Sequence, residues 1–272
     1  MQQILVAAKV TLSLAFLLYA SWSDYKTREV SNRVWVIFAP SALFLSLADL
    51  LIYEPPSTLP LFGLSVGVTV AIAFVLFYSG GFGGADSKAL ICIAFALPFS
   101  TEMLFTPLLA GGASPLARYL FPLTIFSNAV LFAALSGIAM LLLNLKWRLT
   151  TGKKIFEGTL ATESIGKKIL VLITGYKVSV AKLKAKWHIY PMEDIEEDDG
   201  ENPLKRKLVV VPRDEGRDKI VERLSKAVAA GKIDAYVWAT PGLPMLIFIT
   251  VGLIIALLLG DVVWMLVSFV LG

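Results

Sequence analysis

Histidine and cysteine are almost absent from this chain of 272 residues, which contains only His188 and Cys92. One cysteine cannot form a disulfide within the chain, and the two residues supply too few ligands for a Cys/His zinc site. The sequence has no His-Glu-x-x-His motif, the zinc-binding motif of metalloproteases, so a zinc membrane protease is excluded. A serine hydrolase would have to recruit His188 from the most polar part of the chain. We therefore expect no metal ion and no cofactor, and we interpret Cys92 as a small packing residue.

Charged residues are also scarce. They make up 17% of the chain, and hydrophobic residues make up 57%. A soluble domain averages about 25% charged and about 45–50% apolar residues. The apolar residues form blocks of about 20, the length that crosses a bilayer as a helix. In such a chain a net charge of +4 indicates basic cytoplasmic loops and no nucleic-acid partner. The composition predicts a polytopic membrane protein.

Six apolar segments have the length of a membrane span: 4–22, 34–53, 61–79, 87–108, 119–145 and 243–262. Residues 146–235 differ sharply, because they hold 19 of the 25 Lys and Arg residues and 14 of the 21 Asp and Glu residues. We predict an all-α polytopic membrane protein with about six transmembrane helices and a small α/β cytoplasmic domain inserted before the last helix. The expected domains are 1–145 with helices one to five, 146–240 as the soluble domain and 241–272 with helix six.

The polar region contains patterns of both secondary-structure types. Three segments have enough β-branched and aromatic residues for short strands: 186–192, 207–212 and 234–239. From 214 to 230 apolar residues recur on one helical face ahead of Gly231, which predicts a helix. Residues 165–180 fit a strand or a helix. The acidic run 193–201 is predicted to be a solvated loop, with binding of a cation or a basic peptide as the alternative.

Basic residues set the expected orientation. Lys and Arg lie in the connections 23–33, 80–88 and 146–235, whereas the opposite connections hold only Arg118. Because basic loops stay in the cytoplasm, we expect both termini outside and both Asp24 and Asp86 at the cytoplasmic face. Three other acidic residues are expected near the outer face: Asp49, Glu102 and Asp261. Lys9, in the first span, is expected to reach an interface with its long side chain.

A glycine-rich stretch precedes Asp86. Four glycines stand between Ser79 and Ala85, and Asp86 follows at the start of an apolar segment. A carboxylate at the edge of a membrane helix is costly unless it has a partner, so it marks a functional site, and glycines allow another chain to come close. Simpler interpretations stay open: the glycines form only a turn, Asp86 caps a helix, and Asp24 faces solvent beside Lys26 and Arg28.

Two carboxylates close together can hydrolyse a peptide bond without a nucleophilic side chain. One deprotonates the attacking water while the other protonates the carbonyl oxygen. Since like charges cannot both ionise cheaply at short range, such a pair shares one proton. Which aspartate acts as base and which as acid is not specified by the sequence, because the titration belongs to the pair.

The motifs around the two aspartates carry a family resemblance. Gly83-Gly-Ala-Asp86 resembles the Gly-x-Gly-Asp motif of membrane aspartyl proteases, with Ala85 where the second glycine usually stands. The segment Ser23-Asp24-Tyr-Lys-Thr-Arg-Glu-Val-Ser-Asn32 resembles the first-aspartate segment of the type IV prepilin and preflagellin peptidases. Two aspartates about 60 residues apart and a polar domain before the last span are similar to the archaeal preflagellin branch. The resemblance covers most of 1–110 in motif order and the remainder in layout.

This resemblance implies an aspartyl endopeptidase that cuts a short basic leader from preflagellin or prepilin-like precursors at the cytoplasmic face. Asp24 and Asp86 would be catalytic, with Gly83, Gly84 and Ala85 beside the substrate. The partners would be those precursors and the lipid bilayer. Glu29 or the acidic run would receive the basic leader. Methyl transfer, a second activity of bacterial relatives with a cysteine-rich loop, is not expected because this chain has only Cys92.

Two functions of other classes remain open from the sequence. The chain could be a proton-coupled transporter that uses the same carboxylates, although such proteins often contain repeats and midplane charges, and no repeat is visible here. It could also be a membrane anchor whose polar domain gathers partner proteins.

Overall fold

The computed structural model describes residues 1–80, 82–104, 106–108, 114–196, 205–210, 216–242 and 244–271. The chain divides into two compact units, Met1–Ala133 with Pro244–Gly272, and Ala134–Leu243. We call them the helical unit and the mixed unit and describe each by itself.

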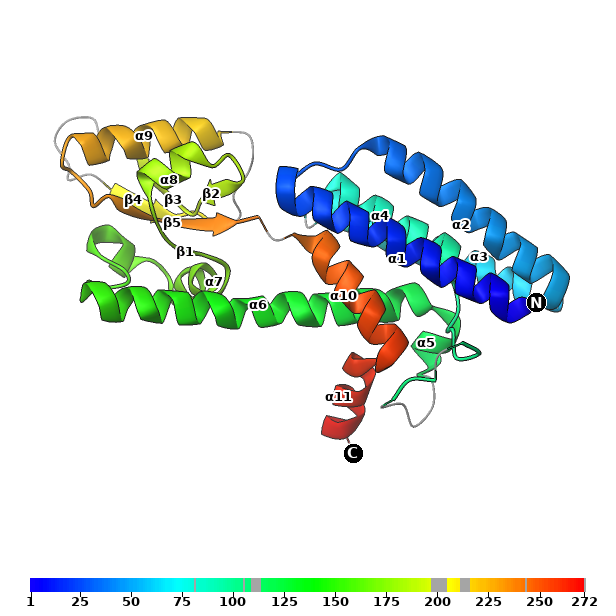
Figure 1. Cartoon of the computed structure of the whole chain (residues 1–272). Helices are drawn as coiled ribbons and strands as arrows, with labels where there is room; N and C mark the ends of the chain where they lie inside the picture. Colours follow the sequence, from blue (N-terminus) through cyan, green and yellow to red (C-terminus); the bar gives the residue numbers. More distant parts are fainter. Residues whose placement is uncertain are drawn as a thin grey trace. The chain divides into compact units, whose positions relative to one another are not determined.

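Most of the described residues are helical, and four helices are long and apolar enough to cross a membrane: α1 (Gln2–Thr27), α2 (Asn32–Tyr53), α3 (Thr58–Tyr78) and α6 (Phe121–Thr151) (Figure 1). A fifth span is possible if α10 (Met245–Leu258) and α11 (Val262–Leu271), which bend by 68° at their junction, count as one. The chain is therefore a membrane protein with a small sheet region. The expected count of six spans is not reached among the described residues.

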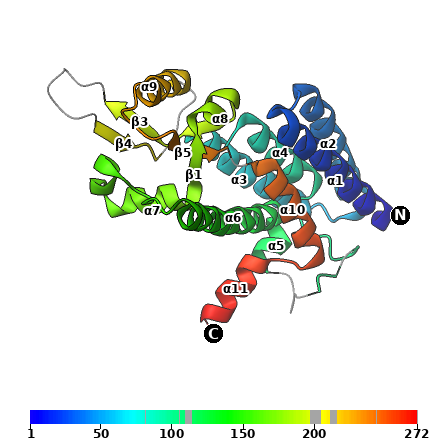
Figure 2. The same ribbon diagram turned by 60° about the vertical axis from the view of Figure 1, so that its left-hand side comes forward.

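The core of the helical unit lies between α1, α2, α4 (Gly84–Ala96) and α10. Leu17, Phe38 and Ile93 are completely buried in it, and the rings of Phe16 and Phe38 stack with their centroids 4.8 Å apart. Figures 1 and 2 show α1, α2 and α4 running side by side. Cys92 is 2% exposed in this core, which confirms its interpretation as a packing residue. A short helix, α5 (Pro115–Tyr119), precedes α6.

The fourth helix is shorter than the predicted span 87–108, and that prediction is wrong in its second half. Helix α4 ends at Ala96, two residues before Pro98, whose ring disfavours helical backbone in the preceding residue. Carbonyl groups released at the end of a buried helix need new partners. The hydroxyl of Ser46 donates to the carbonyl of Ala96 (3.0 Å), and that of Ser65 donates to the carbonyl of Pro98 (2.9 Å). Neighbouring helices thus stabilise a non-helical backbone in the core.

Three charged residues that were expected at interfaces are buried instead. Lys9 does not extend to an interface: it is 7% exposed, and its Nζ lies 2.6 Å from Oδ2 of Asp49, which is also 7% exposed. Asp261 is 7% exposed and accepts hydrogen bonds from the hydroxyls of Ser114 (2.7 Å) and Thr124 (3.3 Å). Each has found a partner within the protein, which is what a buried charge requires. Glu102 is exposed, but the membrane face on which it lies stays a prediction.

The mixed unit contains two small sheets. In the first, β5 (Tyr236–Pro241) lies between β1 (Tyr176–Ser179) and β2 (Ile189–Pro191), antiparallel to both, with Tyr176 opposite Ala239. In the second, β3 (Glu193–Glu196) pairs antiparallel with β4 (Lys205–Leu208). The helical elements are η1 (Gly158–Thr162), α7 (Ile165–Thr174), α8 (Val180–Ala185) and α9 (Arg217–Ala229). Val178, Leu224 and Val237 belong to the core that the first sheet forms with α8 and α9.

Several predictions for the polar region are confirmed. Strand β2 falls in segment 186–192 and α9 falls in 214–230, while β5 overlaps segment 234–239 but ends later, at Pro241. Segment 207–212 overlaps β4, which begins earlier, at Lys205, and ends at Leu208. Residues 165–180 contain both alternatives, because α7 ends at Thr174 and β1 begins at Tyr176.

The acidic run does not begin as a solvated loop. Glu193 is fully buried, accepting hydrogen bonds from the backbone N–H of Trp238 (3.0 Å) and from Arg206 (2.6 Å). Residues 193–196 form strand β3, while 197–201 lie outside the described residues. A buried ion pair of this kind is stabilised by its hydrogen bonds, and Glu193 is therefore a structural residue of the sheet.

Candidate active site

Asp24 lies in the last turn of α1, which continues to Thr27. The helix is closed by Arg28, whose N–H donates to the carbonyl of Asp24 (2.9 Å) in a left-handed conformation with φ of 58°. Among the described residues, Arg28 is the only non-glycine with positive φ, in a position where glycine or asparagine is usual. The hydroxyl of Ser23 donates to the carbonyl of Glu29 (2.7 Å), so the turn that follows Asp24 is fixed by hydrogen bonds from both sides.

Asp86 is the third residue of α4, and Gly83 occupies the N-cap position. The Oδ2 atom of Asp86 accepts the backbone N–H of Gly83 (3.0 Å). Asp86 is thus not the N-cap itself, although its carboxylate does stabilise the first turn of the helix, as acidic residues there commonly do.

The two glycines of the motif differ in how much space they have. A Cβ atom at Gly83 would lie 3.1 Å from Oδ2 of Asp86, whereas one at Gly84 would meet only Phe77, at an ordinary 3.7 Å. Glycine at position 83 therefore keeps room for the carboxylate. Ala85 is half-buried and packs against the core of the helical unit.

The fold brings the two aspartates together from opposite ends of their helices. Asp24 acts electrostatically on the carboxyl group of Asp86, as does Arg28, and Arg28 also acts on Asp24. Both aspartates are half-buried. The pair of acids is therefore not separated by the thickness of the helical unit, and the positive charge of Arg28 acts on both.

Further residues at this end of the unit were not singled out from the sequence. The backbone of Leu246, in the first turn of α10, is near enough to act electrostatically on the Asp86 carboxyl group. The Nζ of Lys88 donates to Oδ1 of Asn32 (2.7 Å), which joins α4 to the start of α2 beside the two aspartates. Asn32 closes the first-aspartate segment and so carried a sequence signal. The sequence identified Arg28 only as a basic neighbour of Asp24, and Leu246 carried no signal, because a backbone conformation and a long-range contact leave no local pattern.

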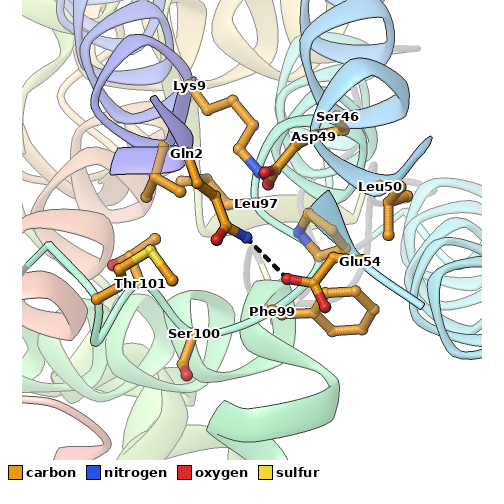
Figure 3. A pocket seen from close by; sticks show the side chains of 13 residues that line it. Gln2, Lys9, Ser46, Asp49, Leu50, Glu54, Leu97, Phe99, Ser100 and Thr101 are labelled. Atoms are coloured by element: carbon orange, nitrogen blue, oxygen red, sulfur yellow. Dashed lines mark hydrogen bonds and ion pairs between the residues drawn. The ribbon is translucent and has the colours of Figure 1, made fainter. Parts of the chain in front are cut away.

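A cavity of about 100 Å³ lies in the helical unit, but neither Asp24 nor Asp86 lines it. Figure 3 shows Lys9 and Asp49 meeting at one side of it, and Nε2 of Gln2 donating to Oε1 of Glu54 (2.9 Å). Gln2 and Lys9 belong to the first third of α1, about 20–30 Å along the helix from Asp24 at 1.5 Å per residue. This cavity is therefore a separate polar pocket. Within the described ranges, no three His, Cys, Asp or Glu side chains are grouped so as to hold a metal ion.

Comparison with known sequences adds independent information. The profile of the type IV leader peptidase family matches residues 11–145, and that of the archaeal peptidase A24 C-terminus, type II, matches residues 167–262. A preflagellin peptidase of Methanococcus voltae is 29% identical over 256 residues, which cover 92% of this chain and 94% of the relative. A preflagellin peptidase of Methanococcus maripaludis is 24% identical over 247 residues, covering 90% and 92%. The prepilin peptidase EppA of Methanothermobacter thermautotrophicus is 26% identical over 122 residues, covering 45% of this chain and 32% of that protein.

Proposed function

We propose that this chain, which belongs to the type IV leader peptidase family and is a protease, cuts the leader from preflagellin or type IV prepilin-like precursors, using Asp24 and Asp86. The cleavage takes place at the cytoplasmic face of the membrane, where the basic connections hold that end of α1 and α4. The observation that carries the proposal is the electrostatic proximity of Asp24 and Asp86 in a chain that matches leader peptidases along most of its length.

The chemistry follows from two carboxyl groups that share one proton. The ionised carboxylate takes a proton from water as the water oxygen bonds to the scissile carbonyl carbon, and the protonated carboxyl gives its proton to the carbonyl oxygen. The C–N bond of the resulting gem-diol then breaks, with a proton passing to the leaving amine and another returning to the pair. Arg28 stabilises the one negative charge that the pair retains, and the Gly83 N–H holds Asp86 in a fixed orientation.

Substrate approach depends on the glycine-rich stretch. Gly83 presents no side chain beside Asp86, so an extended peptide can reach the carboxylate along this backbone. Glu29 is exposed five residues after Asp24 and is the acidic residue that would receive the basic leader. Glu193 is excluded from that role, because it is fully buried.

The experiment is cleavage of a precursor by the full chain reconstituted in liposomes. Asp24→Asn and Asp86→Asn each preserve side-chain shape, and each is expected to lower the rate by on the order of 10³-fold or more. Glu102→Gln, which neutralises an exposed carboxylate outside the site, is the matched control and should cleave like the unmodified chain. Wild-type cleavage by either Asn variant would end the proposal.

Proton-coupled transport, the alternative from the sequence, finds no support in the site. Asp24 is in the last turn of α1 and Asp86 in the first turn of α4, whereas transporter sites usually lie near the bilayer midplane. A peptide cleaved in detergent, without two compartments, would separate the two functions.

A further inference from the structure

Helix α7 of the mixed unit has two apolar sides, and only one is covered by the protein. Val171 is completely buried against the small sheet, in a cluster with Leu160. Ile165, Ile169 and Leu170 face away and are 73%, 52% and 43% exposed. We call these three residues the α7 apolar face. Ten residues are too few to cross a bilayer, so this face needs another explanation.

The end of α7 is fixed against the membrane-spanning helix α6. The side-chain amide of Asn144 donates to the carbonyls of Leu172 (3.0 Å) and Gly175 (2.8 Å). Nearer the start of α6, a Cβ atom at Gly137 would lie 3.3 Å from the carbonyl of Ile173. The end of α7 therefore lies level with the stretch between Gly137 and Asn144. Figures 1 and 2 show α7 beside α6.

At that level the surface of α6 itself is apolar and exposed. Leu142, Leu143 and Leu145 are 60%, 48% and 50% exposed, in a helix long and apolar enough to span the bilayer. The first polar turn follows with Lys146 and Arg148, which marks the end of the hydrocarbon region. The α7 apolar face thus lies at the same level along α6 as an exposed apolar surface of the same unit.

The charge around α7 fits one kind of membrane surface. Residues 146–168 contain six basic residues and two acidic ones. The basic residues are Lys146, Arg148, Lys153, Lys154, Lys167 and Lys168. A basic segment beside an apolar helical face is the pattern of a helix that lies in the plane of an anionic leaflet.

We propose that α7 is an interfacial helix, with Ile165, Ile169 and Leu170 among the acyl chains and the neighbouring lysines against anionic lipid headgroups. The helix thereby holds the mixed unit on the membrane surface at the Thr151 end of α6. This inference requires α6 to span the membrane and does not depend on the peptidase chemistry.

The test uses spin labels on the full chain in lipid nanodiscs, in a Cys92→Ala background. The label is placed by Ile169→Cys, by Lys167→Cys on the opposite side of α7, and by Lys219→Cys on the exposed side of α9 in the same unit. Collision with oxygen, which partitions into lipid, is compared with collision with a water-soluble nickel chelate. Circular dichroism and thermal unfolding confirm that each labelled variant is folded.

The expected result is a higher oxygen and lower nickel accessibility at position 169 than at 167 and 219, with position 169 deeper in nanodiscs of phosphatidylglycerol than of phosphatidylcholine. Equal nickel accessibility at 169 and 219 would overturn the interfacial location. Equal depth in both lipids would overturn the requirement for anionic headgroups. Spin–spin broadening at 169 would show that a second copy of the chain covers this face, which would also overturn the proposal.

Discussion

At the scale of single residues, the site depends on the space beside one carboxylate. Gly83 both donates to Asp86 and leaves room for it, since its Cβ would lie 3.1 Å from Oδ2. Glycine at position 84 has no such constraint. The sequence predicted that the glycines of the motif matter, but it could not rank the two, because the ranking comes from the orientation of a side chain three residues later.

Gly83→Ala is therefore expected to lower the cleavage rate of a precursor by about 10- to 100-fold, because a displaced reacting group is costly even when the fold is intact. Its backbone φ of −71° suits alanine, so thermal unfolding should change little. Gly84→Ala is the matched control and should retain most activity. Equal activity of the two variants would show that the 3.1 Å approach has no catalytic importance.

The buried pair of Lys9 and Asp49 makes a second prediction at this scale. Their side chains are 9% and 10% exposed, and Oδ1 of Asp49 is buried without a hydrogen-bond partner. Lys9→Met leaves a buried carboxylate unpaired and should destabilise the protein by about 3–5 kcal/mol. The double variant Lys9→Met, Asp49→Leu should recover most of this loss in thermal unfolding, whereas Lys26→Met, at an exposed position, should be neutral. A double variant as unstable as the single one would contradict this account.

Lys177 gives a pH dependence in the mixed unit. Burial lowers the pKa of Lys177 to about 8; the charge of Glu193 raises this pKa, and that of Arg206 lowers it. The Nζ of Lys177 lies 5.0 Å from the ring centroid of Trp238. In the unfolded chain the Lys177 ammonium keeps its proton up to about pH 10.5. Between these values the unfolded state binds more protons, so stability rises with pH.

The measurement is the thermal midpoint of the wild type minus that of Lys177→Met, from about pH 7 to about pH 10.5. The difference should be constant below the pKa of about 8 and should rise above it. A difference independent of pH across this range would show that Lys177 is not desolvated in the native state.

At the scale of elements, the sequence predicted where helices lie better than where they end. The spans 34–53 and 61–79 match α2 and α3 closely, because long apolar runs without charge have one stable structure in lipid. Span 87–108 does not match α4, which stops at Ala96. Hydropathy could not predict this end, because the segment stays apolar and its new hydrogen-bond donors, Ser46 and Ser65, come from other helices.

Removing the Ser46 hydroxyl should leave the buried carbonyl of Ala96 without this partner, whereas the carbonyl of Pro98 keeps the backbone N–H of Phe121 (3.2 Å) when the Ser65 hydroxyl is removed. Ser46→Ala is therefore expected to cost about 1–3 kcal/mol of stability in thermal unfolding, and Ser65→Ala less. Ser41→Ala is the matched control, since the Ser41 hydroxyl bonds only the carbonyl of Ile37 in its own helix, and it should change stability little. If all three variants unfold alike, the end of α4 does not depend on these hydroxyls.

At the scale of the whole molecule, the sequence predicted a membrane protein with a polar insertion before its last helical segment. The predicted domains 1–145, 146–240 and 241–272 stay a prediction. The boundary between the compact units of the structure falls within α6, at Ala133 and Ala134. A composition change marks where polarity begins. It cannot show that one continuous helix belongs partly to each unit, because that depends on which residues the helix contacts along its length.

For the two aspartates, too, the sequence predicted the general location but not the tertiary contacts. Their motifs and the order of basic connections predicted a common membrane face, and the helical unit brings them within electrostatic reach. The effects of the Arg28 charge and of the Leu246 backbone on Asp86 were not predicted, because both depend on tertiary contacts.

The most direct measurement is the cleavage rate of a precursor by Asp24→Asn, by Asp86→Asn and by the double variant, all reconstituted as full chains. Groups that act as one unit are strongly non-additive. The double variant should therefore retain the same residual rate as either single variant. Losses that multiply in the double variant, or a wild-type rate in either single one, would contradict a catalytic pair.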